Sequence, residues 1–524
     1  MNIDKAIELA IENVRKEGLT DIFRDPFEIS LLKNEKFRAF LSDQVKSRIN
    51  SGSLSGLKVY PISHVLFPKK DAYDFRRAAL IQPIDTITYL ALVLMYADII
   101  EKHRIEKRRN VVFSYRLKPK SGYLFDSKYN FTYFQAHVSG RIKSPRAKVL
   151  VKCDISNFYD RLNLHRLEST LLSLPIEKKL IKLTNELLTF WANRDSYSLP
   201  IGGNASRILA EAALLSVDDY LRSLNVKFCR FVDDYRLFAP DAKTAHSWLT
   251  LLVDRLYLEG LMVNPSKTVI EDVSKTTKTS AVSEEARQVA NELRQGRIIV
   301  GYTGTIPTKF RELSNREIEE LKEVATEELE DKIKNNQILQ PDDVRRFIRI
   351  VVASEDYNKL NIFNSLVEKF PQFTPLLVDL FIKKESALPE SLKNSIREYF
   401  SKMLSEGERY PEYLLISVVR LLGQDGFADK SALMAFFRNL RRNSGAYIGR
   451  AVLDALSKVA NRTDVIEIRQ YYQRADRWEK RAIIRIVDSV LSEEEKRPWL
   501  KNVKVHSGDD LFAVETFDPK KKGK

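Results

Sequence analysis

A pair of adjacent aspartates inside an apolar run constrains this chain more than any other feature. Asp233 and Asp234 follow an aromatic and a β-branched residue within residues 226–238, a pattern that predicts a β-hairpin with both acids at its turn. Such a turn can direct two carboxylates at one point, where bound cations would offset their repulsion. The pair is not specific alone, because charged chains carry similar doublets on solvated surfaces, here Asp218–Asp219, Asp342–Asp343 and Asp509–Asp510.

A third aspartate stands upstream, at the end of another apolar run. Residues 149–151 (Val-Leu-Val) predict a buried strand, and Asp154 lies just beyond it. An acid there is costly unless it pairs or binds a metal, which makes Asp154 a candidate for the same site. A capping aspartate before a helix over residues 160–172 is an equally good interpretation of Asp154 alone.

A glycine-rich turn lies between these acids in the sequence. Pro200, Gly202 and Gly203 predict a tight turn without side chains, where a nucleotide or template backbone could approach closely. A helix is expected to begin near Asn204 or Ser206. A capped loop is the common alternative for such a segment, but the order of acid strand, glycine turn and acid hairpin favours one shared site.

Taken together, five segments resemble the motifs of the reverse transcriptase family, in that family's order. DISNFYD (154–160), LPIGGNASRILAE (199–211) and FVDD (231–234) resemble the first three catalytic motifs of its palm. EGLMVNPSKT (259–268) resembles the fourth motif, and FPKKDAYDFRR (67–77) the basic fingers segment that grips an incoming triphosphate. The resemblance implies an α+β fold with the fingers and palm of a right-hand polymerase and an antiparallel palm sheet.

The resemblance also implies roles for single residues. For two-metal phosphoryl transfer, the implied ligands are Asp154, Asp233, Asp234 and the carbonyl of Ile155. Hard oxygen ligands, with no evident set of His or Cys residues to join them, favour Mg²⁺, or Mn²⁺, over zinc. The implied nucleotide-binding residues are Lys69 and Arg76 on the triphosphate, Tyr159 as a steric gate against a ribose 2′-hydroxyl, Pro200 and Gly202 in the glycine turn, and Lys267 as a proton donor to pyrophosphate. A solvated turn lysine is the alternative for Lys267.

Two residues differ from the usual motifs of the family and indicate a subgroup of it. Ile201 stands where most retroviral, retron and group II intron enzymes carry Gln, and Phe231 where they carry Tyr. With the segment VVFSYRL (111–117) and a long helical second half, the chain resembles the bacterial abortive-infection and defence-associated reverse transcriptases, the AbiK-like group. An apolar Ile201 cannot make the polar contact of that glutamine in templated nucleotide selection. Members of this group range from untemplated, protein-primed synthesis to copying of a dedicated non-coding RNA, and the motifs leave both open.

Positive charge is concentrated ahead of the first acid. The chain has 86 Lys and Arg against 71 Asp and Glu, and residues 101–150 hold 13 of the former and three of the latter. Aromatic residues are interleaved with them, which predicts a surface for single-stranded nucleic acid. A basic exposed face over core aromatics is the alternative. The predicted contacts are Lys107, Arg108, Arg109, Arg141 and Lys143.

The chain is long enough for two or three domains, and its second half is helical by pattern. A polar stretch at residues 273–281 divides a predicted fingers-and-palm domain, 1–280, from an all-α, repeat-like domain, 281–515, and a basic disordered tail, 516–524. The helical domain is expected to shape a product channel, bind an RNA or mediate self-association. Apolar residues at i, i+3 and i+4 predict paired helices at 360–369, 377–382, 392–404, 413–422, 430–440, 448–459 and 481–491.

The other features predict a soluble cytoplasmic protein. Cys153 and Cys229 are expected to be small buried residues, and two cysteines exclude a disulfide framework or a Cys-rich zinc site. The N-terminus has no signal-peptide pattern, and the apolar residues 89–100 are too few to span a bilayer. Expected partners are dNTPs, nucleic acid and further copies of this chain in a homo-oligomer, without a membrane.

Three functions are compatible with these motifs. The first is a DNA polymerase of antiphage defence, with priming by a protein hydroxyl, although 21 tyrosines leave the priming residue unassigned. The second is a conventional reverse transcriptase that needs a primer and an RNA template. The third is an inactive palm scaffold that binds RNA or a partner, and the presence of all three metal-position acids argues against it.

Overall fold

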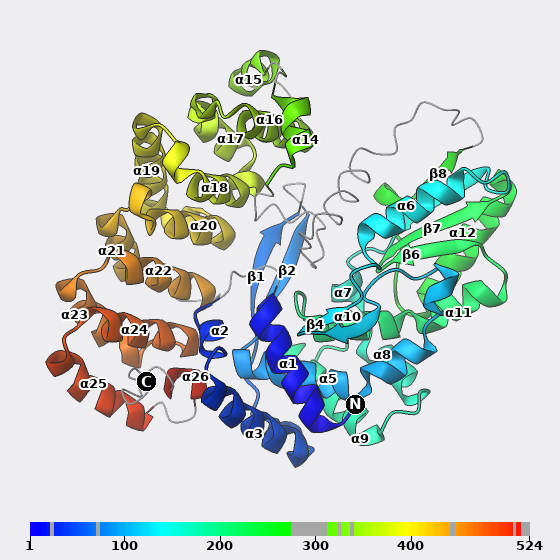
Figure 1. Cartoon of the computed structure of the whole chain (residues 1–524), viewed down its shortest axis with the longest axis horizontal. Helices are drawn as coiled ribbons and strands as arrows, with labels where there is room; N and C mark the ends of the chain where they lie inside the picture. The colour runs from blue at the N-terminus through cyan, green and yellow to red at the C-terminus, as the bar shows by residue number, and fades with distance from the viewer. Residues whose placement is uncertain are drawn as a thin grey trace. The chain divides into compact units, whose positions relative to one another are not determined.

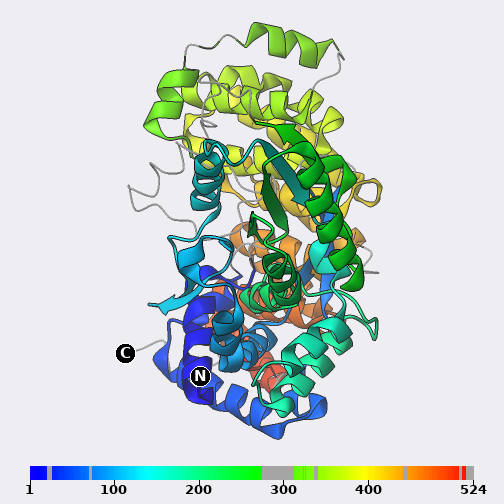
Figure 2. The same ribbon diagram turned by 90° about the vertical axis from the view of Figure 1, so that its right-hand side faces the viewer.

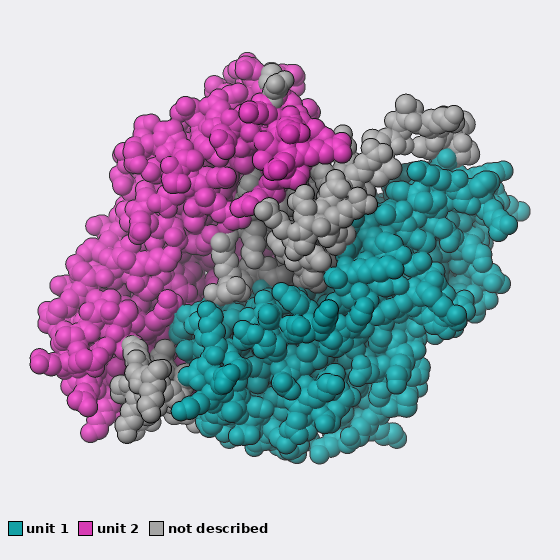
Figure 3. Space-filling model, viewed as in Figure 1, with its two compact units in different colours: residues 1–62, 79–302 teal, residues 63–78, 303–524 magenta. Residues whose placement is uncertain are grey.

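The structure, a computed structural model, describes residues 1–20, 26–69, 74–273, 312–322, 324, 326–335, 340–440, 446–506 and 510–514. The chain divides into two compact units, which are coloured in Figure 3: residues 1–62 with 79–302, and residues 63–78 with 303–524. Helices and strands carry the labels of Figure 1. The predicted boundary at 273–281, apart from Val273, and the predicted tail at 516–524 lie outside the described residues, so both stay predictions.

An antiparallel sheet of four strands lies in unit 1 (Figure 1). Its strand order is β6 (Phe228–Phe231), β7 (Asp234–Ala239), β5 (Val149–Asp154) and β8 (Val269–Asp272). Helix α12 (Ala242–Leu258) packs against β5, β7 and β8, as Figures 1 and 2 show from two sides. Cys153 in β5 and Cys229 in β6 are free and buried, as predicted. The structure confirms the antiparallel palm sheet within an α+β fold.

Helix α5 (Pro83–His103) is a core helix of unit 1. It contacts α1 (Ile3–Glu17), α3 (Glu35–Ser51) and α10 (Asn204–Ala213), and nearly all of its apolar side chains are buried. In the part of the chain that the structure describes, it alone is long and apolar enough to cross a membrane by length and composition, but 83% of its most apolar stretch is buried inside the protein. The helix exceeds the predicted apolar stretch, residues 89–100, at both ends.

The predicted helix over residues 160–172 is two helices instead. α7 (Phe158–Arg161) ends before Asn163, and α8 (Leu164–Leu172) begins directly after it. The side chain of Asn163 accepts hydrogen bonds from two backbone N–H groups of α8. Because this cap competes with continuation of the helix, a continuous apolar pattern does not give a continuous helix here. Further helices of unit 1 are α2 (Glu28–Leu31), α4 (Leu54–Leu57), α6 (Phe131–Ile142), α9 (Lys178–Trp191) and α11 (Leu215–Ser223).

Unit 2 contains a row of paired helices. α18 (Thr374–Lys383), α20 (Glu412–Leu422), α22 (Ala446–Val459) and α24 (Arg477–Val490) contact one another in succession. Intervening helices such as α19 (Glu390–Ser405) pack beside them around a shared apolar core, so the predicted helical half is confirmed. The other helices of this unit include α14 (Asn315–Leu321), α15 (Glu327–Lys334), α16 (Pro341–Ser354), α17 (Phe363–Lys369), α21 (Lys430–Asn439), α23 (Arg462–Gln470), α25 (Glu493–His506) and α26 (Leu511–Val514).

The hairpin of β1 (Ser63–Pro68) and β2 (Phe75–Leu80) departs from the predicted division, which placed it with the N-terminal half. Apart from its last two residues, it belongs to unit 2. There β1 contacts α20 and α22, and the ring centre of Phe75 lies 6.4 Å from that of Tyr413. The contacts of the hairpin with distant helices, rather than its place in the sequence, decide this assignment.

Candidate active site

The two acidic motifs meet at one end of the palm sheet. β5 and β7 are antiparallel neighbours, and Asp154 stands opposite Asp234 in their register. Opposite residues of such strands point to the same face, with Cα atoms about 4.5–5.5 Å apart. Val232 and Asp233 form the two-residue turn between β6 and β7. The backbone N–H of Ile155 donates to the Asp233 carbonyl at 3.2 Å, which ties this turn to the end of β5.

Negative charge at this turn is poorly balanced. Burial, followed by Asp234 and Asp154, raises the pKa of Asp233 from 3.8 to about 7. The pKa of Asp234 is also raised, mainly by burial, although Arg236 lies 3.4 Å from its carboxylate. A bound cation would offset the repulsion between half-buried carboxylates that lie this close together, so the turn favours a positively charged ligand.

The fourth motif brings a basic residue to these acids. Nζ of Lys267 lies 3.2 Å from Oδ2 of Asp154. Asn264 donates to Asp154 twice, from its backbone N–H to the carbonyl at 2.7 Å and from its side chain to Oδ2 at 3.4 Å. The short 3₁₀ turn Pro265–Lys267, capped by Asn264, holds this segment in place. The structure therefore brings Lys267 to the acids as the partner of a carboxylate, and its contact with pyrophosphate stays a prediction.

The predicted metal ligands have the chemistry that suits a hard divalent cation, but their side chains are not arranged around a common point. Asp154, Asp233, Asp234 and the Ile155 carbonyl are all oxygen donors, which suits Mg²⁺ or Mn²⁺. Across the described ranges, no group of three or more His, Cys, Asp or Glu side chains is placed to hold a metal ion. Two of the acids instead form ion pairs with basic residues. Each of these pairs engages one carboxylate oxygen, Oδ2 of Asp154 and Oδ1 of Asp234.

The glycine turn lies beside Tyr159. The backbone N–H of Leu199 donates to the Tyr159 carbonyl at 2.9 Å. Burial raises the pKa of the Tyr159 hydroxyl, and Asp233 contributes to this shift. Pro200 is buried, Gly202 has a φ of 118° that glycine adopts without strain, and α10 begins two residues later, as predicted. The structure brings Tyr159 and the glycine turn together, and their contact with a nucleotide stays a prediction.

Lys69 and Arg76 lie on the β1–β2 hairpin. Nζ of Lys69 is 2.9 Å from a carboxylate oxygen of Asp74, so this basic residue is paired within the hairpin. Both residues belong to unit 2, whereas the three acids belong to unit 1. Their grip on a triphosphate therefore stays a prediction.

The basic segment only partly matches a nucleic-acid surface. Many of its aromatic rings pack against other rings, for example Phe113 at 5.3 Å from Tyr133 and Phe131 at 5.3 Å from Phe231 between ring centres. This packing favours core aromatics over a stacking platform for bases. The predicted contact residues are placed as follows: Lys107 donates to the Leu117 carbonyl, Arg108 pairs with Glu106, Arg141 lies over the ring of Phe238, and Arg109 and Lys143 are exposed.

The sequence did not predict a buried network of charges beside the turn of Val232 and Asp233, called the acid turn below. Arg230 donates to Asp218 at 2.7–3.0 Å and lies 3.0 Å from Glu211, which also accepts a bond from Arg104 at 2.6 Å. Burial opposes ionisation of Glu211, but the two arginines outweigh it and hold its pKa below the usual value. The signals in the sequence are Arg230 inside the apolar run 226–238 and Glu211, the one Glu of helix α10.

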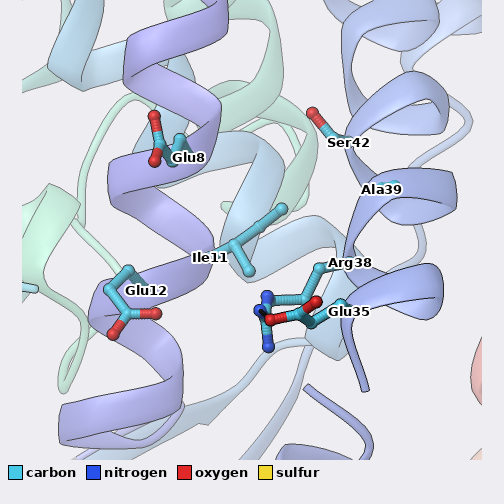
Figure 4. Close-up of a pocket in the computed structure, with 7 residues that line it drawn as sticks. All are labelled: Glu8, Ile11, Glu12, Glu35, Arg38, Ala39 and Ser42. Atoms are coloured by element: carbon cyan, nitrogen blue, oxygen red, sulfur yellow. Dashed lines mark ion pairs between the residues drawn. The ribbon is translucent and has the colours of Figure 1, made fainter. Parts of the chain in front are cut away.

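A cavity of about 360 Å³ lies between α1 and α3. Figure 4 shows its lining side chains, among which Arg38 pairs with Glu35 at 3.5 Å. None of the predicted site residues lines it, and two of its acids form ion pairs within their own helices, Glu12 with Arg15 and Glu35 with Arg38. The lining residues are Glu8, Ile11, Glu12, Glu35, Arg38, Ala39 and Ser42.

Comparison with known proteins gives one family match. Residues 97–288 match the family described as reverse transcriptase (RNA-dependent DNA polymerase), and this segment contains all three acids. No curated protein matches the sequence. Among solved structures, telomerase from Candida albicans, in complex with a TWJ fragment of telomeric RNA, is 14% identical, with 73% of this chain and 70% of that chain covered and a TM-score of 0.29. The corresponding telomerase from Candida tropicalis is 13% identical, with coverages of 72% and 63% and a TM-score of 0.31. Values this low carry no information on substrate.

Proposed function

We propose that this chain, which carries a reverse transcriptase domain over residues 97–288, is a DNA polymerase that joins dNTPs by two-metal phosphoryl transfer. The observation that supports this most strongly is the register of the palm sheet, in which Asp154 stands opposite Asp234 and beside the turn of Asp233. Phosphoryl transfer depends on positioning and charge neutralisation, and carboxylates gathered at one end of a sheet provide for both.

Each residue at the site has a part in this proposal. Two Mg²⁺ or Mn²⁺ ions would activate the attacking hydroxyl and neutralise the leaving pyrophosphate. Asp154, Asp233, Asp234 and the Ile155 carbonyl would hold them, after Asp154 leaves its pair with Lys267. Lys267, once released, would then protonate pyrophosphate. The residues at the nucleotide's phosphates and sugar would be Lys69, Arg76, Tyr159, Pro200 and Gly202.

The biological setting extends the same proposal. The resemblance of the motifs to the AbiK-like group supports a cytoplasmic enzyme of antiphage defence that works as a homo-oligomer. Its synthesis would be either untemplated, with a protein hydroxyl as primer, or templated by a dedicated non-coding RNA. Ile201 supports this departure from ordinary templated synthesis, because it cannot make the polar contact of glutamine.

The test is DNA synthesis by the purified full chain with Mg²⁺ or Mn²⁺ and labelled dNTPs. We expect DNA without an added primer or template, and label that stays with the protein on a denaturing gel until protease is added. Strict dependence on a primed RNA template would identify a conventional reverse transcriptase instead. No DNA under any of these conditions would leave the inactive scaffold as the remaining function.

Replacement of Tyr159 by Ala should admit ribonucleotides. The ring of Tyr159 is proposed to clash with a 2′-hydroxyl, so its loss should reduce the preference for dNTPs over rNTPs by about 10- to 100-fold. The ratio of kcat/KM for the two nucleotide types measures this. Tyr159→Phe keeps the ring and serves as the control, so an equal loss of preference in both variants would contradict the gate.

Replacement of Lys267 by Met should slow the chemical step. Loss of a proton donor to the leaving group typically lowers kcat by about 10² or more, while the KM for dNTP changes little. Single-turnover rates measure the step, and Lys267→Arg, which keeps the charge but is a poor proton donor, should be similarly slow. A normal rate in both variants would make Lys267 a structural partner of Asp154 only.

A further inference from the structure

The turn that carries Asp233 has a backbone conformation that its own sequence disfavours. Val232 has a φ of 55°, in the left-handed region, where a β-branched side chain clashes with the backbone. In a two-residue hairpin turn, a positive φ at the first central residue is a position that glycine usually occupies. Such a conformation persists only where surrounding contacts impose it. Contacts around Val232 therefore hold it in this conformation.

The guanidinium of Arg230 makes one of these contacts. Its Nη1 donates to the Val232 carbonyl at 3.1 Å. Its Nε and Nη2 donate to both carboxylate oxygens of Asp218, and Nη2 lies 3.0 Å from Glu211. The side chains of Arg230, Glu211 and Asp218 are 0%, 2% and 3% exposed, so these bonds are shielded from water. The guanidinium thus pairs with Glu211 of α10 and Asp218 of α11, and its remaining nitrogen, Nη1, donates to the turn.

We propose that Arg230 is a positioning residue of the active site. By holding the Val232 carbonyl, it keeps the acid turn in the conformation that directs Asp233 and Asp234 toward Asp154. The N–H of Ile155 holds the next carbonyl of the turn, so the two central peptide groups are fixed from opposite strands. This inference rests on the proposed function, because it assumes that the turn binds metal ions.

The test compares Arg230→Lys, Val232→Gly and the double variant. Lys keeps the charge but cannot hold both acids and the carbonyl at once, so kcat should fall about 100-fold, as expected for a small displacement of reacting groups. Glycine adopts the turn conformation without support, so Arg230→Lys should cost much less activity in the Val232→Gly background. The kcat of the double variant relative to Val232→Gly should exceed the kcat of Arg230→Lys relative to the unmodified chain by at least about tenfold. Melting temperatures should not recover with it, because the buried acids remain poorly paired. Failure of Val232→Gly to restore activity would overturn the proposal.

Arg104→Lys is the matched control. Arg104 is equally buried and bonds to the same Glu211 at 2.6 Å, but its other bonds go to Glu101 and to the carbonyls of Ser114 and Tyr115, not to the turn. It should lower the melting temperature as Arg230→Lys does, with kcat per folded molecule within a few-fold of the unmodified chain. An equal loss of kcat in both variants would make Arg230 a structural residue only.

Binding of Mn²⁺, measured by calorimetry on the full chain, separates this inference from the proposed function. Arg230→Lys should weaken binding about tenfold and Val232→Gly should restore it, even if the chain makes no DNA. Unchanged binding in Arg230→Lys, or no binding by the unmodified chain, would overturn the positioning role. If Arg230→Lys does not fold, Asp218→Asn takes its place, since it loosens the guanidinium while leaving it present, and the same rescue by Val232→Gly is required.

Discussion

Replacement of both Asp233 and Asp234 by Asn should abolish DNA synthesis by the purified chain. Asn keeps the size of the side chain but removes the negative charge that would hold divalent ions. Since those ions would supply the charge neutralisation of the proposed reaction, we expect the rate to fall by about 10³-fold or more. Incorporation of labelled dNTPs with Mg²⁺ or Mn²⁺, followed over a thousandfold range of protein concentration, measures this loss.

The control for this pair is Asp219→Asn. Asp219 belongs to another aspartate doublet of unit 1, is half exposed, and pairs with Arg222 at 2.9 Å on α11. An exposed pair of this kind contributes little to stability, so this variant should be as active as the unmodified chain. Synthesis by the double variant at the unmodified rate would end the catalytic assignment and favour an inactive palm that binds RNA or a partner.

Asp233→Asn alone should stabilise the metal-free protein at high pH. The pKa of Asp233 is raised from 3.8 to about 7 by burial and by the neighbouring acids, so the folded chain binds more protons than the unfolded chain between these values. Stability must therefore fall as pH rises from about 4 to about 7 and stay low above it. Asn removes this penalty, which corresponds to about 4 kcal/mol at most for a shift of this size. The variant should melt higher than the unmodified chain at pH 8 in EDTA, and at a similar temperature at pH 4.

Divalent ions should reverse this order. Under the proposed function, Mg²⁺ or Mn²⁺ would bind the ionised acids, so it should raise the melting temperature of the unmodified chain at pH 8 and leave that of Asp233→Asn unchanged. DNA synthesis should likewise rise with pH toward about 7, with a midpoint that falls as the metal concentration increases. Asp219→Asn should follow the unmodified chain in every condition. A metal-free Asp233→Asn variant that is less stable at pH 8 would show that Asp233 is a structural acid.

The parts of the site that could be predicted are those with a local cause. The run before Asp154 is a strand because its apolar residues are consecutive, and a hairpin turn follows Phe231 because polar residues interrupt an apolar run. The turn lies one residue earlier than predicted, at Val232 and Asp233, and Asp234 is the first residue of β7. α10 begins where Gly203 ends the turn and helix-forming residues follow. Where two local signals compete, as at Asn163, the pattern of apolar residues predicted one helix and a side-chain cap divides it.

The sequence by itself determined the strands, the turns, the helical second half and the order of the acids, since each depends on residues within a few positions of one another. Only the tertiary structure decided the partners of buried charges. Asp218 belongs to an aspartate doublet that the sequence suggests is on the surface. In the structure it accepts hydrogen bonds from Arg230, which also donates to the carbonyl of Val232. The β1–β2 hairpin likewise joins unit 2 through contacts with helices more than 300 residues away in the sequence. Such contacts depend on which surfaces pack together, and no local pattern of residues encodes that choice.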